Sequence, residues 1–573
     1  MLFIDSNNKC SNETKRGIRL EVFLILQLLL GFSLSNVCFL LGFSLHAWHF
    51  WASFAAVTGL AFWYSRKAGL WMIGLNLLML LLTFYTFTYV HVDASICHLP
   101  ISHFLQDGWN PVTESSVEAV RARFAGCGMS EANDFLAYHI IAAPKFSQIL
   151  AAQMQSAFGL FSAGGYALWF MCFALAISGY RFSTSVFRAG RWTSAVFAAL
   201  LCSNTIIAEV CFLGLVDYVA YSAIAIAAMS LRMWLDTKSR IDLYMFFGCA
   251  VVAVATKMNS LACVVLLLIS AAVIGRREKD MRIGLLVFLA ALAFFCVIPY
   301  WASAWRYGSP FYPAHSFRAD VPTMDLTSDF IGNEDANRMG YIARMVYAWV
   351  SKPLAVWGCR IWYSADNFDP QWKWEFLSGG QGWMFSLILW SGALLSLFIN
   401  RNRTTLIAWI LLLAFLLVPV KYIGYSRYAN FVFFVIAVLW FNIVFSLPAR
   451  MRQVAISVLV VFALNQAHVC ASTFLRQVRD EGIRQRNIET VAKFRDYRFE
   501  KPLDNWEYVV KNRFPLDGAS PSFEGTNAVD VSWPLVFTGP RLLVRDDSVY
   551  WSQTDGFPSP VWSGSCFKEG GGR

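Results

Sequence analysis

Long apolar runs, separated by short polar connections, set the pattern of this chain. Each run is about 20 residues long, which is the length of helix that crosses roughly 30 Å of hydrocarbon. The runs lie at 20–43, 46–64, 69–90, 154–179, 192–213, 216–234, 241–256, 260–275, 283–301, 383–400, 404–420, 429–447 and 453–470. They predict an all-α polytopic membrane domain over residues 1–470, with about 13 transmembrane helices.

Basic residues mark one side of the predicted bundle. Every second connection is short and rich in Lys and Arg, an excess that is typical of cytoplasmic connections. These residues are Lys15, Arg16, Arg19, Arg66, Lys67, Arg181, Arg188, Arg191, Lys238, Arg240, Arg276, Arg277, Lys279, Arg282, Arg401, Arg403, Arg450 and Arg452. The bias predicts a cytoplasmic amino terminus and an extracytoplasmic carboxyl terminus.

Three long segments then face the outside: the loops 91–153 and 302–382, and the carboxyl-terminal segment 471–573. The first loop contains "SVEAVRARFAGCGM", which predicts a short amphipathic helix. The last segment begins helically, and its later strand-like runs predict a small α+β extracytoplasmic domain. Those runs are Leu535–Thr538, Leu542–Arg545 and Ser548–Trp551. This asymmetry indicates that the protein works at the external face of a membrane.

Composition agrees with the pattern. Of the 573 residues, 57% are hydrophobic and 15% charged, whereas a soluble domain has about 25% charged residues. The net charge of +10 comes largely from the short connections, so nucleic acid is not predicted as a partner. The 13 cysteines show no C-x-x-C spacing, which argues against a zinc site or a disulfide framework. The sequence leaves open whether Cys97 pairs with Cys127.

An acid and an imidazole, Asp93 and His98, lie just after the end of the third apolar run, in "VHVDASICHLP". Asp93 is either a solvated cap on the helix exit or a general base. The apolar neighbours Ile96, Leu99 and Ile101 favour a loop that folds back onto apolar surface. A carboxylate that is partly removed from water there has a raised pKa, which suits a base. His98 adds a second polar group to the same loop, although its role there is open to a structural interpretation.

Isolated basic residues stand at several predicted outer ends. Lys257, in "VAVATKMNSLACVV", is a lone cation between two apolar runs. It either extends toward the headgroups as an anchor or holds a lipid phosphate, and spacing does not decide between them. Lys421 and Arg427 in "VKYIGYSRY", together with Arg306 in "WRYGSPFYP", favour an anionic ligand or interface anchors in the same way.

The loop 302–382 ends in a stretch rich in tryptophan and acids. Its tryptophans either stack on sugar rings or mark the membrane interface, and the second interpretation is favoured for most of them. Asp366 and its acidic neighbours are weak candidates for a divalent metal, so a metal is possible but not indicated.

One stretch resembles a known family. "DASICHLPISHFLQDGWNP", Asp93–Pro111, resembles the first outer loop of GT-C superfamily glycosyltransferases, in which an aspartate precedes a Tyr-His-Leu-Pro-like stretch and a Gln-x-Gly. Cys97 stands where tyrosine is usual, while the other positions fit; these are His98, Leu99, Pro100, Gln106 and Gly108. "AYHIIAAPKFSQILAAQM" resembles the Pro-Lys segment that often follows.

The resemblance implies an inverting glycosyltransferase in the bacterial inner membrane. It implies that a sugar passes from a polyprenyl-phosphate carrier to a glycan, lipid or protein acceptor at the outer face of the membrane. The resemblance implies no specific cofactor. Asp93 matches the family's acid, and His98 is its predicted catalytic neighbour. We predict that basic residues bind the donor phosphate, namely Lys257, Lys421, Arg427 and Arg306. The predicted acceptor-binding residues are His139, Lys145 and Asp366.

Two departures and two alternatives accompany this prediction. Ala94 follows Asp93 where many members have a second acid, and the Trp-Trp-Asp signature of oligosaccharyltransferases is absent. Protein N-glycosylation is therefore disfavoured. The alternatives are a lipid-linked glycan polymerase or ligase, and a membrane transporter or flippase. Transporters usually place ionisable groups within spans and often contain repeats. Here most charged residues cluster at the ends of the predicted spans and no repeat is visible.

Overall fold

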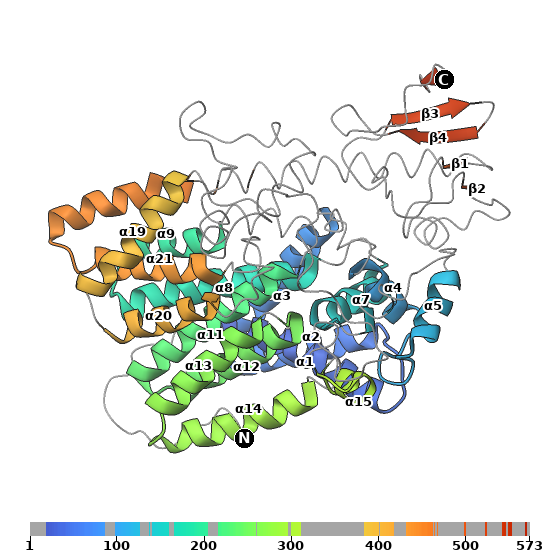
Figure 1. Cartoon of the computed structure of the whole chain (residues 1–573), viewed down its shortest axis with the longest axis horizontal. Coiled ribbons are helices and arrows are strands. Elements are labelled where there is room, and N and C mark those ends of the chain that lie inside the picture. Colours follow the sequence, from blue (N-terminus) through green and yellow to red (C-terminus); the bar gives the residue numbers. More distant parts are fainter. Residues whose placement is uncertain are drawn as a thin grey trace.

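A computed structural model describes most of the helical part of the chain. The described residues are 19–85, 98–126, 137, 140–141, 143–159, 165–203, 216–258, 260–295, 300–310, 383–399, 402–416, 431–461, 463–464, 467, 471 and five short strands. Long helices packed side by side form the body of the molecule (Figure 1). They are α1 (Leu20–Leu40), α2 (Trp48–Tyr64), α3 (Arg66–Tyr85), α8 (Gly165–Val186), α9 (Arg191–Cys202), α11 (Asp217–Thr237), α12 (Arg240–Thr256), α13 (Ser260–Ile274), α14 (Lys279–Phe295), α19 (Trp383–Ile399), α20 (Arg403–Leu416) and α21 (Phe431–Val444).

Each of these helices overlaps one predicted run, and residues 449–461 are helical as well. The predicted run 154–179 is wrong at its start. A separate helix, α7 (Phe146–Phe158), ends at Gly159, whose φ of +64° closes the helix in the left-handed region. Helix α8 begins only at Gly165. Apolar residues on both sides of the break hid it, because hydropathy does not register a left-handed glycine.

Three described helices are both long and apolar enough to cross a membrane: Leu20–Leu40, Arg66–Phe84 and Asp217–Thr237. Apart from α8, which has 22 residues but is not among these three, the other long helices have at most 17 residues within their described extent. The number of spans therefore stays a prediction. Exposed apolar side chains follow single helix faces, as at Leu70, Leu77, Leu81 and Phe84 of α3. A continuous apolar face of this kind suits hydrocarbon rather than water. The chain is therefore an integral membrane protein.

Ion pairs between helix ends show that the helices alternate in direction. Arg19, before α1, and Arg181, in the last turns of α8, both bond Asp242 in the first turn of α12, at 2.6 and 3.0 Å. Two further pairs join neighbouring connections: Lys238–Glu278 at 3.0 Å and Arg240–Asp280 at 3.0 Å. The start of α1, the end of α8 and the start of α12 thus lie together, as the basic-residue pattern requires.

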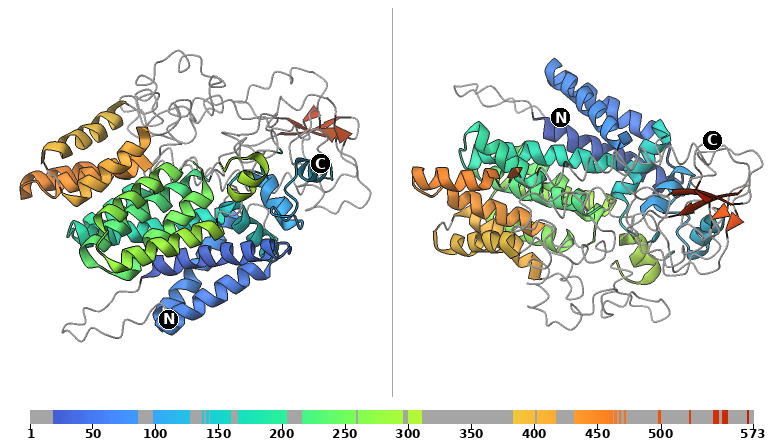
Figure 2. Two further views of the ribbon diagram at one scale, coloured as in Figure 1. Left: turned by 60° about the horizontal axis from the view of Figure 1, so that its bottom comes forward. Right: turned by 90° about the horizontal axis from the view of Figure 1, so that it is seen from above.

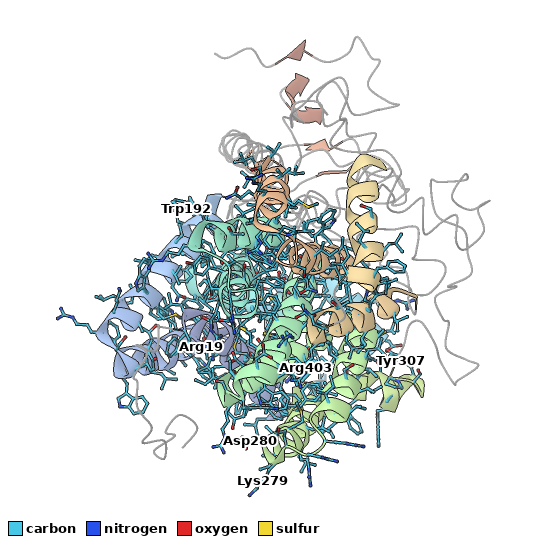
Figure 3. All side chains as sticks on the ribbon, turned by 90° about the vertical axis from the view of Figure 1, so that its left-hand side faces the viewer. Arg19, Trp192, Lys279, Asp280, Tyr307 and Arg403 are labelled. Carbon is cyan, nitrogen blue, oxygen red and sulfur yellow. The ribbon has the colours of Figure 1, made fainter. Side chains whose placement is uncertain are left out.

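We call this end of the bundle the basic end. Figure 3 is turned toward the left-hand side of Figure 1, where the basic end lies, and labels Arg19, Lys279, Asp280 and Arg403. Which side of a membrane it faces stays a prediction.

Shorter helices gather at the opposite end of the bundle. They are α4 (Leu99–Gln106), α5 (Val117–Gly126), α7 and α15 (Ala302–Tyr307), and Figures 1 and 2 show them away from the basic end. The α5 helix confirms the one expected in "SVEAVRARFAGCGM". The fully buried side chain of Ile101 on α4 confirms that this part of the loop folds back onto apolar surface.

Two carboxyl-terminal strands confirm two of the predicted strand runs. Strand β3 (Arg541–Arg545) pairs in antiparallel register with β4 (Ser548–Ser552), and β5 (Lys568–Glu569) pairs with the other edge of β3. Strands β1 (Arg498–Phe499) and β2 (Ser522–Phe523) form a parallel pair. The run Leu535–Thr538 and the helical start of the segment lie outside the described residues, and the α+β domain stays a prediction.

The core is centred on α11. Its apolar stretch is 94% buried, and it packs against α8 on one side and α12 on the other. Small residues let these helices approach closely, which is how membrane helices maximise van der Waals contact; on α11 and α12 they include Ala223, Ala225, Ala227, Ala250 and Ala253. This packing brings the first residue of α11, Asp217, beside the end of α12.

Candidate active site at the end opposite the basic end

Three of the predicted site residues have described side chains: His98, Lys145 and Lys257. For Arg306 the structure describes only the backbone, which lies in α15. The other predicted residues lie outside the described residues, as do both cysteines of the open pairing; they are Asp93, His139, Asp366, Lys421, Arg427, Cys97 and Cys127. The site is therefore built from what surrounds the first three.

His98 is held at the start of α4. It is the N-cap residue of that helix, and its carbonyl accepts a hydrogen bond from the Ser102 hydroxyl at 3.0 Å. Its ring Nδ1 lies 2.6 Å from Nε2 of Gln148, a residue of α7 that is only 2% exposed. The backbone and one ring nitrogen of His98 are thus both fixed, which is what a positioned catalytic imidazole needs.

The loop after α4 is anchored to the membrane bundle. The Asn110 side chain donates to the carbonyls of Phe39 and Phe43, at 2.9 and 3.2 Å, just where α1 ends. The fully buried Trp109 donates from Nε1 to the Glu114 carbonyl at 2.8 Å. Sequence reasoning missed both residues, although Asn before Pro in "DGWNP" is a turn signal. These bonds make α4 a rigid support rather than a free loop.

Lys145 lies inside the protein, immediately before α7. It is 1% exposed, its Nζ donates to the carbonyls of Ile141 and Ala143 at 2.8 Å each, and it lies 5.6 Å from the centre of the Trp109 ring. Burial lowers the pKa of the Lys145 amino group to about 7. These contacts stabilise the turn that precedes α7 and so fix the direction of that helix. The acceptor-binding role stays a prediction, and no described contact supports it.

The buried amino group predicts a pH-dependent stability. An unfolded lysine has a pKa of about 10.4, so between about pH 7 and pH 10 the unfolded state binds a proton that the folded state does not. Stability should therefore rise with pH across this window, by on the order of 4 kcal/mol in total, and be flat below it. We expect Lys145→Met to remove most of this rise, measured as thermal unfolding of purified protein at pH 6.5 to 9.5.

Lys67→Met serves as the matched control, because Lys67 is exposed at the start of α3. This variant should keep the wild-type slope. Equal slopes in wild type and Lys145→Met would show that Lys145 keeps its proton when buried.

Lys257 is not the lone cation that the sequence suggested. Its Nζ forms an ion pair with the carboxylate of Asp217, which begins α11. The side chains are 19% and 5% exposed, respectively. The pair lies at the end of α12 opposite the basic end, and α12 also contacts α7, which packs against α4. An acid that begins an apolar run, as in "GLVDYVA", was the signal that would have pointed to Asp217.

Neutral polar contacts join the helices deeper in the bundle. Gln27 of α1 donates to Asn76 of α3 at 2.7 Å and to Tyr166 of α8 at 2.9 Å. Gln153 of α7 donates to the Gly31 carbonyl and to Ser35, each at 2.8 Å. These contacts are between uncharged groups. In the described spans the acidic and basic residues lie within about two turns of helix ends.

Taken together, these observations define a polytopic helical membrane protein that gathers an imidazole, ammonium groups and a carboxylate at one end of its bundle. No family model and no curated protein matches the chain. Within the described residues no cluster of three or more His, Cys, Asp or Glu is placed to hold a metal ion.

Two solved structures that the chain resembles are crystal structures of ArnT from Cupriavidus metallidurans. The first, bound to undecaprenyl phosphate, is 14% identical, and the alignment covers 80% of this chain and 86% of that one, with a TM-score of 0.40. The second, in the apo state, is 14% identical over 81% and 87% of the two chains, with a TM-score of 0.39. A likeness of this degree carries no conclusion about the fold or activity of this chain.

Proposed function

We propose that this protein is a GT-C type glycosyltransferase that moves a sugar from a polyprenyl-phosphate donor to an acceptor at the external face of the membrane. The observation that carries the proposal is the position of the Lys257–Asp217 pair. It is a largely buried charged pair at helix ends away from the basic end, on the side of the bundle where His98 lies. A lipid-linked donor must present its phosphate at this depth.

The proposed reaction is a single displacement. The acceptor hydroxyl attacks the anomeric carbon, its proton passes to the carboxylate of Asp93, and the bond from that carbon to the phosphate oxygen breaks. The configuration inverts, and polyprenyl phosphate leaves with the bonding electrons. Lys257 would stabilise the charge on the leaving phosphate. The sequence offers further cations for the same task, namely Lys421, Arg427 and Arg306.

His98 is proposed to orient the acceptor hydroxyl through its second ring nitrogen. His139 and Asp366 remain proposed acceptor contacts on sequence grounds. Lys145 is better placed to support α7 than to touch an acceptor, because its amino group is directed to backbone carbonyls.

The direct test is to purify the protein and identify its bound lipid by mass spectrometry, then supply polyprenyl-phosphate sugars and follow release of the carrier. We expect a polyprenyl phosphate in the lipid fraction and sugar transfer to an added acceptor. The proposal would be ruled out if the purified protein retained no polyprenyl phosphate and did not accelerate release of the carrier from polyprenyl-phosphate sugars.

A glycan polymerase or ligase would use the same lipid-linked chemistry, and product length distinguishes it from a single-sugar transferase. The buried polar side chains of α1, α3 and α8, namely Gln27, Asn76 and Tyr166, are the observation that favours a transporter or flippase. They are uncharged and bonded to one another, which suits helix packing. Lipid movement across vesicles without sugar transfer would favour the transporter.

A further inference from the structure

The amide of Gln148 has a single described hydrogen-bond partner, the ring of His98. Gln148 lies in the first turn of α7 and is 2% exposed, and its Nε2 is 2.6 Å from His98 Nδ1. Its Oε1 makes no hydrogen bond within the described residues. A buried amide is costly unless it bonds, so a residue that serves packing alone would be better replaced by Leu or Met. The ring contact is what accounts for the amide.

The roles in this contact follow from the donor and acceptor inventory. A carboxamide nitrogen only donates, so the Nδ1 it faces must accept and must be unprotonated. The proton of the neutral imidazole then lies on Nε2. In the structure the amide nitrogen Nε2, and not the oxygen Oε1, faces Nδ1, while Oε1 makes no hydrogen bond within the described residues.

We infer that Gln148 is the positioning residue of His98, holding the imidazole neutral with its proton on Nε2. This rests on the proposed function in one respect: the Nε2–H group is then a hydrogen-bond donor to an oxygen of the acceptor. The proton of the reacting hydroxyl remains for Asp93. Gln148 does not touch the substrate in this scheme; it selects which ring nitrogen does.

Other titratable groups on the packed elements are His103 and Asp107 on and just after α4, and Lys145 before α7. Arg123 of α5 donates to the Asp107 carbonyl at 3.4 Å. The contact with the His98 ring that the structure describes is made by Gln148, so Gln148 is the residue to replace.

The tautomer can be measured without any activity. The chain has 8 histidines, so protein labelled with ¹⁵N-histidine gives a tractable spectrum, and His98→Gln assigns the His98 signals. Protonated and unprotonated ring nitrogens differ in ¹⁵N chemical shift. We expect wild-type protein to show a protonated Nε2 and an unprotonated Nδ1. In Gln148→Glu the carboxylate accepts from Nδ1, so Nδ1 should become protonated.

Gln153→Leu is the matched control, since it removes a buried amide of the same helix that bonds α1 instead. It should leave the His98 signals unchanged. A protonated Nδ1 in wild type, or a pattern that Gln148→Glu does not alter, overturns the inference. Wild-type protein that gives the expected spectra but transfers no sugar would sink the proposed function and leave the positioning role standing.

The activity readout is a pH profile. Gln148→Glu should move the acidic limb of turnover to higher pH by roughly one pH unit. Gln148→Leu should lower turnover about five- to tenfold and have no further effect when His98→Gln is already present. An additive loss in that double variant would mean that Gln148 acts independently of His98, which also overturns the inference.

Discussion

Replacing Asp93 by Asn is expected to lower the rate of sugar transfer by about 10²–10⁴-fold, the contribution of a positioned general base. The amide keeps the size and most of the hydrogen bonding of the carboxylate and loses its basicity. Asp93 lies outside the described residues, but the covalent chain limits where it can be. It is five residues before His98, so the two Cα atoms are at most about 18 Å apart.

That tether matters because His98 is fixed. The α4 helix is anchored by Asn110 to the end of α1, so Asp93 stays near the end of the bundle whatever the path of the intervening residues. The donor carbon is held near headgroup depth by its lipid. A base within reach of His98 can meet that carbon, and one far out in 471–573 has no such constraint.

The measurement is transfer from a purified polyprenyl-phosphate donor, with wild type and Asp93→Asn in matched amounts. Donor binding should be retained, because the carboxylate is assigned to the acceptor. Asp107→Asn is the control: this acid lies in the same loop and is exposed, and its variant should turn over normally. If Asp93→Asn is as active as wild type, the base is another acid, with Asp134 or Asp366 next in order.

The helices were predictable because each one that crosses the hydrocarbon core needs an apolar run of about 20 residues, and such runs are visible in the sequence. Even so, α7 and α8 were merged, since the break depends on the backbone of Gly159 and not on polarity. The octapeptide helix α4 was not predicted either, because eight residues show too little periodicity. Its Pro, in the first turn, is compatible with a turn as well as a helix start.

The site was predictable only in part, for a related reason. The position of Lys257 at a helix end could be read from the sequence, whereas its partner Asp217 is 40 residues away and is brought to it by the packing of α11 on α12. Gln148 is one of several similar glutamines on α7, and what distinguishes it is the contact with α4. Tertiary contacts between distant helices therefore decide which polar residues form the site.

Because Lys257 forms an ion pair with Asp217, a test of Lys257 requires variants of both residues. Lys257→Met alone leaves a buried carboxylate without its counter-ion, and Asp217→Asn leaves a mostly buried ammonium, each at a cost of about 3–5 kcal/mol. We expect both single variants to unfold at lower temperature than wild type. The double variant, with both charges removed, should recover most of that loss.

Binding of the carrier lipid then distinguishes a structural role of Lys257 from a role in binding the lipid phosphate. A charge-assisted contact to phosphate contributes about 1.5–3 kcal/mol, so Lys257→Met and the double variant should bind polyprenyl phosphate roughly ten- to a hundredfold more weakly. Asp217→Asn should bind at least as tightly as wild type, because it removes the anion that competes with the phosphate for Lys257. Arg240→Gln, which breaks an exposed pair at the basic end, should leave binding unchanged. Wild-type lipid affinity in a stable double variant would make the Lys257–Asp217 pair purely structural, and the phosphate would then have to be held by cations such as Lys421 and Arg427.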